Sequence, residues 1–139
     1  EKNVFALKII IKSKKHAVIQ LGPIDGLKMI RKNWFERYLS KNYSGSPQNG
    51  YFRSVKGRNI TNLLSKVQQI LINIKKSFPH ENKVVLAFND KIKYQNMISS
   101  MNEMRTLPKN KKAFELTNFI GRKEKTRVLF PMVVLAENR

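Results

Sequence analysis

The segment from Asn59 to Phe78 constrains the fold more than any other part of the chain. Its apolar side chains recur three and four positions apart, so they form one continuous stripe along an α-helix. Asn59 suits the N-cap position, and Lys75 and Lys76 suit the negative C-terminal end of the helix dipole. Pro79 ends the pattern. Such a helix must bury its stripe against a sheet or another helix.

Strands are predicted before and after this helix. The segments Val4–Lys12 and His16–Leu21 are rich in β-branched residues and are joined by a short polar turn, which predicts a β-hairpin. Lys83–Phe88 is apolar on both faces, as in a central strand. Val128–Glu137 is predicted to be the last strand, and Pro131 restricts its first part to a sheet edge or a strand entry.

A second helix is predicted between Ile92 and Leu107, where apolar residues again follow helical spacing. Residues 27–39 also have helical spacing, residues 40–58 form a Gly/Ser/Asn/Pro-rich loop, and residues 107–127 form a charged connection. We therefore expect one α+β domain spanning residues 1–139. It has a mixed β-sheet, made of the N-terminal hairpin plus two further strands, with two main helices packed on one face.

The formal net charge of +19 predicts attraction to polyanions such as nucleic acid, anionic lipid or acidic wall polymers. However, Lys outnumbers Arg, whereas Arg is preferred for bidentate contacts to bases and phosphates. A solvated surface with no dedicated polyanion partner explains the charge equally well. The possible polyanion contacts are Lys109, Lys111, Lys112, Arg122, Lys123 and Lys125.

No motif in the sequence predicts an enzyme, a cofactor or a metal site. The chain has no cysteine, and His16 and His80 lie in polar, turn-like contexts. Glycine-rich phosphate loops and nucleophile elbows are absent from the sequence. Aromatic residues alternate with cations in residues 32–43 and 49–58, which could stack nucleic-acid bases. The apolar face of an amphipathic segment explains them better.

Asp90 follows the apolar run Val84–Phe88 almost directly. An acid between a strand and a helix could be a catalytic acid, part of a phosphate site, or a helix cap. We favour the cap, because a carboxylate there can accept hydrogen bonds from the free amides of the first helical turn.

The stretch LAFNDKIKYQNMISSMNEMR, Leu86 to Arg105, resembles the signature of the ExbD/TolR family of biopolymer-transport proteins. Asp90 and Tyr94 occupy its most characteristic positions, and an apolar helix face follows them. The closing PMVVLAEN is similar to the last strand of the family. Residues 23–58 and 107–127 are longer than the corresponding links in the family, so the resemblance implies two insertions there.

The resemblance implies a non-enzymatic, stator-type accessory subunit of an inner-membrane complex that is driven by proton-motive force. The domain would lie in the periplasm, anchored by a single transmembrane helix that we expect upstream of this chain. The protonatable Asp of such complexes belongs to that helix, so no catalytic residue is expected here. The implied partners are a second copy, a proton-channel subunit of the ExbB/TolQ kind, and peptidoglycan or an energy-transducing protein.

The last strand is the expected contact, because an edge strand offers unpaired backbone groups to an added strand. The alternative function is a basic nucleic-acid-binding module. The candidate edge residues are Met132, Val133, Val134, Leu135 and Ala136.

Overall fold

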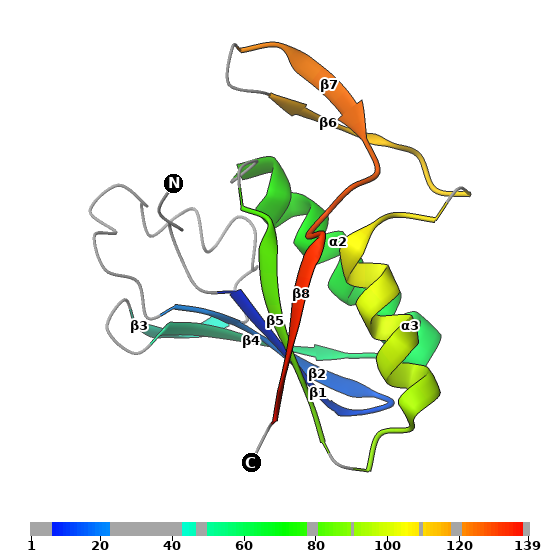
Figure 1. Cartoon of the computed structure of the whole chain (residues 1–139). Coiled ribbons are helices and arrows are strands. Elements are labelled where there is room, and N and C mark those ends of the chain that lie inside the picture. Colours follow the sequence, from blue (N-terminus) through cyan, green and yellow to red (C-terminus); the bar gives the residue numbers. More distant parts are fainter. Residues whose placement is uncertain are drawn as a thin grey trace.

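The computed structural model describes residues 7–22, 43–46, 50–77, 81–89, 91–108, 110–117 and 121–137 (Figure 1). The predicted helix in residues 27–39 lies outside these ranges. The elements in chain order are β1 (Leu7–Ser13), β2 (His16–Leu21), β3 (Tyr43–Ser46), β4 (Gly50–Lys56), α2 (Ile60–Ser77), β5 (Lys83–Phe88), α3 (Tyr94–Arg105), β6 (Phe114–Thr117), β7 (Lys123–Thr126) and β8 (Met132–Glu137).

Six strands form one mixed sheet in the order β3-β4-β2-β1-β5-β8. The hairpin β1–β2 and the pairs β2–β4 and β3–β4 are antiparallel, whereas β1–β5 and β5–β8 are parallel. α2 packs against β2 and β4, and α3 packs against β5 and β8, on the same face of the sheet (Figure 1). This arrangement confirms the predicted α+β class and the mixed sheet with helices on one face.

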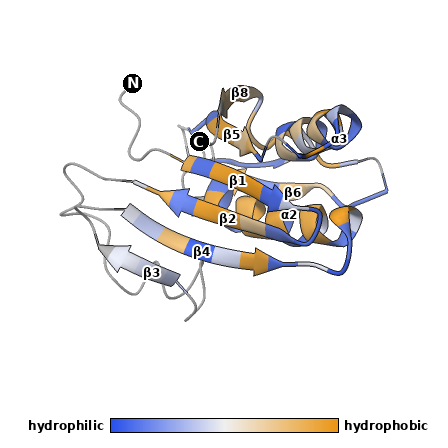
Figure 2. Cartoon of the chain, turned by 90° about the horizontal axis from the view of Figure 1, so that it is seen from below, coloured by the Kyte–Doolittle hydropathy of each residue, from blue (hydrophilic) through white to orange (hydrophobic). Residues whose placement is uncertain are grey.

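The core lies between this face of the sheet and the two helices. Ile9 of β1 is paired with Ile19 of β2, and both are fully buried, as is Leu71 of α2. Full burial of one such side chain stabilises the fold by about 1.5–3 kcal/mol. Buried and partly buried residues alternate along β1 and β2, which is the pattern of strands with one covered face, and Figure 2 shows hydrophobic residues in the middle of both strands.

The start of α2 confirms the predicted cap. The Oδ1 atom of Asn59 accepts a hydrogen bond of 2.8 Å from the backbone N–H of Asn62, in the first turn of the helix. No helix in the described part of the chain is long and apolar enough to cross a membrane.

The helix α3 begins at Tyr94, four residues after Asp90, the predicted cap. The N-cap position belongs to Lys93, whose side chain makes no capping hydrogen bond, and Asp90 itself lies outside the described residues. Two backbone amides that precede the helix donate to Asn89. The carbonyl of Asn89 accepts from Ile92 N–H at 3.0 Å, and its Oδ1 accepts from Lys91 N–H at 3.1 Å.

The loop predicted for residues 40–58 is wrong, because β3 and β4 form a hairpin at the end of the sheet. Gly45 has a φ of 116°, and a Cβ atom there would lie 2.1 Å from the carbonyl oxygen of Gly50. The glycines that suggested a loop therefore permit close strand pairing. Tyr51 and Val55 of β4 are buried in the core.

The charged connection predicted for residues 107–127 is also corrected. It contains β6 and β7, which pair antiparallel as a separate two-stranded sheet. The last strand begins at Met132, later than predicted, because the preceding residues bond elsewhere. Leu129 N–H donates to the carbonyl of Arg105 at 2.8 Å, and Phe130 N–H donates to that of Met104 at 3.0 Å.

Candidate functional site: a free strand edge and a basic arm

Strand β8 has one neighbour, β5, among the described strands, so its other side is a free sheet edge. Met132 N–H donates to the carbonyl of Asn82 at 3.0 Å, toward β5. Successive residues of a strand direct their backbone groups to opposite sides. The amides and carbonyls of Val133 and Leu135 are therefore directed to the free edge, where an added strand could pair with them.

Large apolar side chains are exposed along the same strand. Met132 is 57% exposed, Leu135 is 50% exposed and Val134 is 39% exposed. An exposed, apolar edge strand is typical of a contact with another polypeptide. This places the predicted contact residues at a sheet edge, whereas their binding of a partner stays a prediction.

A buried cation from α2 holds the segments that precede β5 and β8. Lys75 donates hydrogen bonds to the carbonyl of Glu81 and, at 3.1 Å, to Oδ1 of Asn82. Its Nζ also lies 5.3 Å from the centroid of the Phe130 ring, a cation–π distance. Lys75 thus contacts the residues that set where β8 begins.

Burial lowers the pKa of the Lys75 amino group below 10.5, and the nearby carboxylate of Glu81 opposes this by favouring the charged form. The backbone carbonyl and the aromatic ring also favour the charged ammonium. Burial likewise lowers the pKa of Arg53, which lies on β4.

The second candidate site is the two-stranded sheet of β6 and β7. We define the basic arm as residues 110–117 and 121–127. It rises from the body at one end of the molecule, beyond the C-terminal end of α2 (Figure 1). Its exposed cations outnumber its carboxylates, Glu115 and Glu124. The exposed cations are Lys112, Arg122, Lys123, Lys125 and Arg127.

Not every predicted polyanion contact points to solvent. Lys111 donates a hydrogen bond of 2.5 Å to Oε1 of the buried Gln68, whose Nε2 donates to the carbonyl and carboxylate of Glu103. Lys111 therefore ties the arm to α2 and α3. Lys109 lies outside the described residues.

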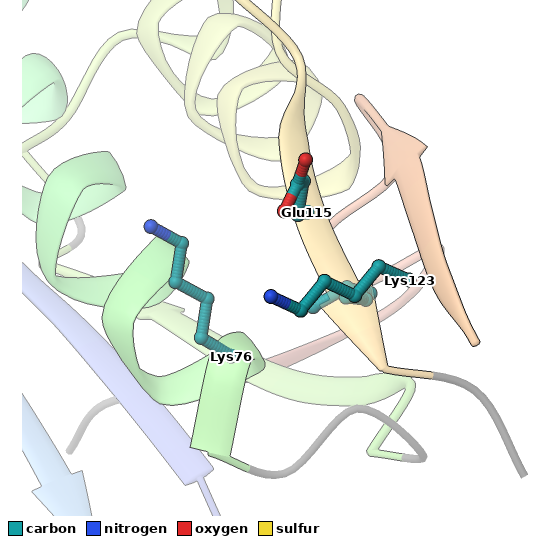
Figure 3. A pocket seen from close by; sticks show the side chains of 4 residues that line it. Lys76, Glu115 and Lys123 are labelled. Carbon is teal, nitrogen blue, oxygen red and sulfur yellow. The ribbon is translucent and has the colours of Figure 1, made fainter. Parts of the chain in front are cut away.

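A hollow of about 400 Å³ lies between the end of α2 and the arm. Lys76 stands on the α2 side, and Lys123 reaches toward it from β7, with the carboxylate of Glu115 on β6 (Figure 3). Leu116 adds an apolar surface. Within the described residues, neither lysine makes an ion pair. The hollow therefore offers two ammonium groups and one carboxylate to a ligand.

The other predicted site residues are not brought together. Tyr94 is 75% exposed at the first position of α3. Tyr51, from a stretch considered for base stacking, is buried and lies edge-on to Tyr43 with 5.6 Å between ring centroids. The other aromatic stretch considered, residues 32–42, lies outside the described residues.

The described residues contain no cluster of side chains that could hold a metal ion. No group of three or more His, Asp or Glu side chains converges there. His16 instead lies 2.6 Å from Ser54 Oγ through its Nε2 atom, joining β2 to β4, and His80 lies outside the described residues.

Compared with family models, with curated proteins and with solved structures, this chain matches none of them.

Two residues that organise these sites were not predicted in these roles: Gln68, and Lys75, which was expected only to suit the helix dipole. Both lie on the apolar stripe of α2, since Leu64, Gln68, Leu71 and Lys75 follow one another at four- and three-residue steps. Polar residues inside an apolar helical stripe were the available signal.

Proposed function

We propose that this domain is the non-enzymatic, soluble part of a stator-type accessory subunit of the ExbD/TolR kind, and that it dimerises through β8. In this proposal the domain lies in the periplasm beside the inner membrane. It links a proton-channel subunit to peptidoglycan or to an energy-transducing protein.

The free edge of β8 carries the proposal. A strand with outward-directed amides at Val133 and Leu135, flanked by exposed apolar side chains, can continue the sheet into a second copy. Further support comes from the element order. The hairpin β1–β2, α2, β5, α3 and β8 follow in this order, and the additional pairs β3–β4 and β6–β7 fall within the two segments where the resemblance implies insertions.

The test is a proline substitution that removes one outward donor. Leu135→Pro eliminates an N–H at the free edge while leaving the ladder to β5 complete, since Val134 and Ala136 make that ladder. We expect the variant to stay folded by circular dichroism and to sediment as a monomer at concentrations where the parent chain is a dimer.

Leu135→Ala is the matched control, because it truncates the same side chain and keeps the N–H. It should weaken the dimer less than the proline does. A parent chain that sediments as a monomer, or a proline variant that remains dimeric, would refute the role of β8.

A further inference from the structure

We propose that the basic arm is a contact site for the anionic phospholipid surface of a membrane, with one headgroup phosphate seated between Lys76 and Lys123. The inference rests on the proposed function, because a domain anchored beside the inner membrane meets lipid headgroups.

The chemistry of the hollow suits a phosphate that carries a hydroxylated headgroup. The amino groups of Lys76 and Lys123 can donate hydrogen bonds to phosphate oxygens from two sides (Figure 3). The carboxylate of Glu115 repels the phosphate but can accept hydrogen bonds from headgroup hydroxyls. Leu116 can pack against glycerol carbons. The volume of about 400 Å³ is large enough for one headgroup.

The rest of the arm extends this site into a cationic strip. Lys123 and Lys125 are two residues apart on β7, so their side chains share one face, about 6.6–6.8 Å apart along the strand. Lys112 and Arg127 of the basic arm are also exposed. Clusters of four to eight cations beside a membrane are typical of anionic-lipid binding, and each adds about a factor of five to the affinity.

The same residues favour lipid over nucleic acid. Single-stranded nucleic acid is usually held by aromatic side chains on which bases stack, and the aromatic residue of the described arm, Phe114, is buried in the core. Lysine supplies compact point charges that suit diffuse attraction to headgroups, rather than the rigid fork that arginine offers to bases.

The experiment measures co-sedimentation of the chain with phosphatidylcholine vesicles that contain or lack phosphatidylglycerol. We expect binding that requires phosphatidylglycerol and weakens as salt is raised. The triple variant Lys76→Gln, Lys123→Gln and Lys125→Gln should lower the partition coefficient roughly 100-fold, by the factor of five for each cation. Glu115→Gln should raise it, because it removes the carboxylate that opposes the phosphate.

A charge-matched control removes three cations elsewhere. The control variant carries Lys12→Gln near the end of β1, Lys14→Gln in the β1–β2 turn and Lys91→Gln in the β5–α3 connection. The β1–β2 turn and the β5–α3 connection lie at the other end of the molecule from the arm (Figure 1). This control should retain most of the binding. Equal losses in the two triple variants would show that net charge acts without a site and would overturn the proposal.

Two further outcomes also decide the matter. The chain could bind a short duplex or single-stranded DNA more tightly than vesicles at the same salt, and lose this binding in the arm variant. That result would assign the arm to nucleic acid and overturn the proposal.

Sedimentation of the same samples without vesicles reports dimerisation through β8. A chain that binds vesicles without forming the dimer would refute only the role of β8. A chain that forms the dimer without binding vesicles would refute only the lipid contact.

Discussion

The amino group of Lys75 lies 5.3 Å from the centroid of the Phe130 ring, two residues before β8 begins. The same Nζ donates a hydrogen bond to Oδ1 of Asn82, and the carbonyl of Asn82 accepts from Met132 N–H, the first amide of β8. One buried cation on α2 therefore positions both segments that enter the parallel strand pair. We regard Lys75 as a positioning residue for the proposed edge.

Replacing Lys75 by Met should destabilise the fold and loosen the start of β8. The carbonyl of Glu81, in a buried residue, loses its charged donor, which costs about 1–3 kcal/mol. Urea unfolding gives the free energy, and hydrogen exchange at Met132 reports the strand. The neighbouring Lys76→Met is the control: its side chain is exposed, so stability should change little. Equal losses in both variants would contradict the positioning role.

The pH dependence of stability should carry the signature of this buried amine. Burial lowers the pKa of Lys75 in the folded chain below its ordinary value of 10.5. At pH values between the lowered pKa of folded Lys75 and 10.5, the unfolded chain binds this proton more tightly than the folded chain does. The free energy of unfolding therefore rises with pH across that window. The unfolding free energy of the parent minus that of Lys75→Met should therefore increase as pH approaches 10.5. The other lysines are common to both chains and cancel. If the difference between the two free energies of unfolding fell as the pH rose, the pKa of Lys75 would be raised in the folded chain, which would contradict this prediction.

The adjacent residues Lys111 and Lys112 should behave differently. Lys111→Met leaves Oε1 of the buried Gln68 without its donor, so we expect a loss of about 1–3 kcal/mol in unfolding free energy. Lys112→Met alters an exposed side chain and should leave stability nearly unchanged while weakening vesicle binding. The reverse order of stabilities would show that Lys111 does not tie the arm to α2.

The parts of the fold that follow simple periodicity were predictable from the sequence. The stripe of α2, the hairpin β1–β2 and the bounds of β5 each come from local alternation or from three- and four-residue spacing, which burial against one face imposes. The edge position of β8 was also predictable, because Pro131 precedes it.

Strand pairs built from turn-forming or charged residues were not predictable in this way. Gly45 and Gly50 are typical of loops, yet both are paired in the β3–β4 ladder with positive φ angles that glycine tolerates. In the arm, Glu115 is paired with Lys125, so the charges that suggested a solvated connection lie opposite one another in a ladder. Both pairs join neighbouring strands, but their turn-forming and charged residues do not follow the hydrophobic alternation from which strands are predicted.

The most direct test of the central claim is disulfide crosslinking through β8. The chain has no cysteine, so each substitution introduces a unique thiol. In an antiparallel pairing of two β8 edges, Val133 of one copy and Leu135 of the other exchange backbone hydrogen bonds. Val134 of one copy then faces Val134 of the other. The Cα atoms of such a facing pair are about 4.5 Å apart, within the range that a disulfide spans.

Val134→Cys should therefore form a covalent dimer under mild oxidation, at a concentration where the parent chain is dimeric. Ser44→Cys, on the opposite edge strand β3, should remain largely monomeric under the same conditions. Rapid crosslinking at Val134 with little at Ser44 is the result that we predict. Equal crosslinking at both edges, or none at Val134 in a dimeric sample, would contradict an interface built on β8.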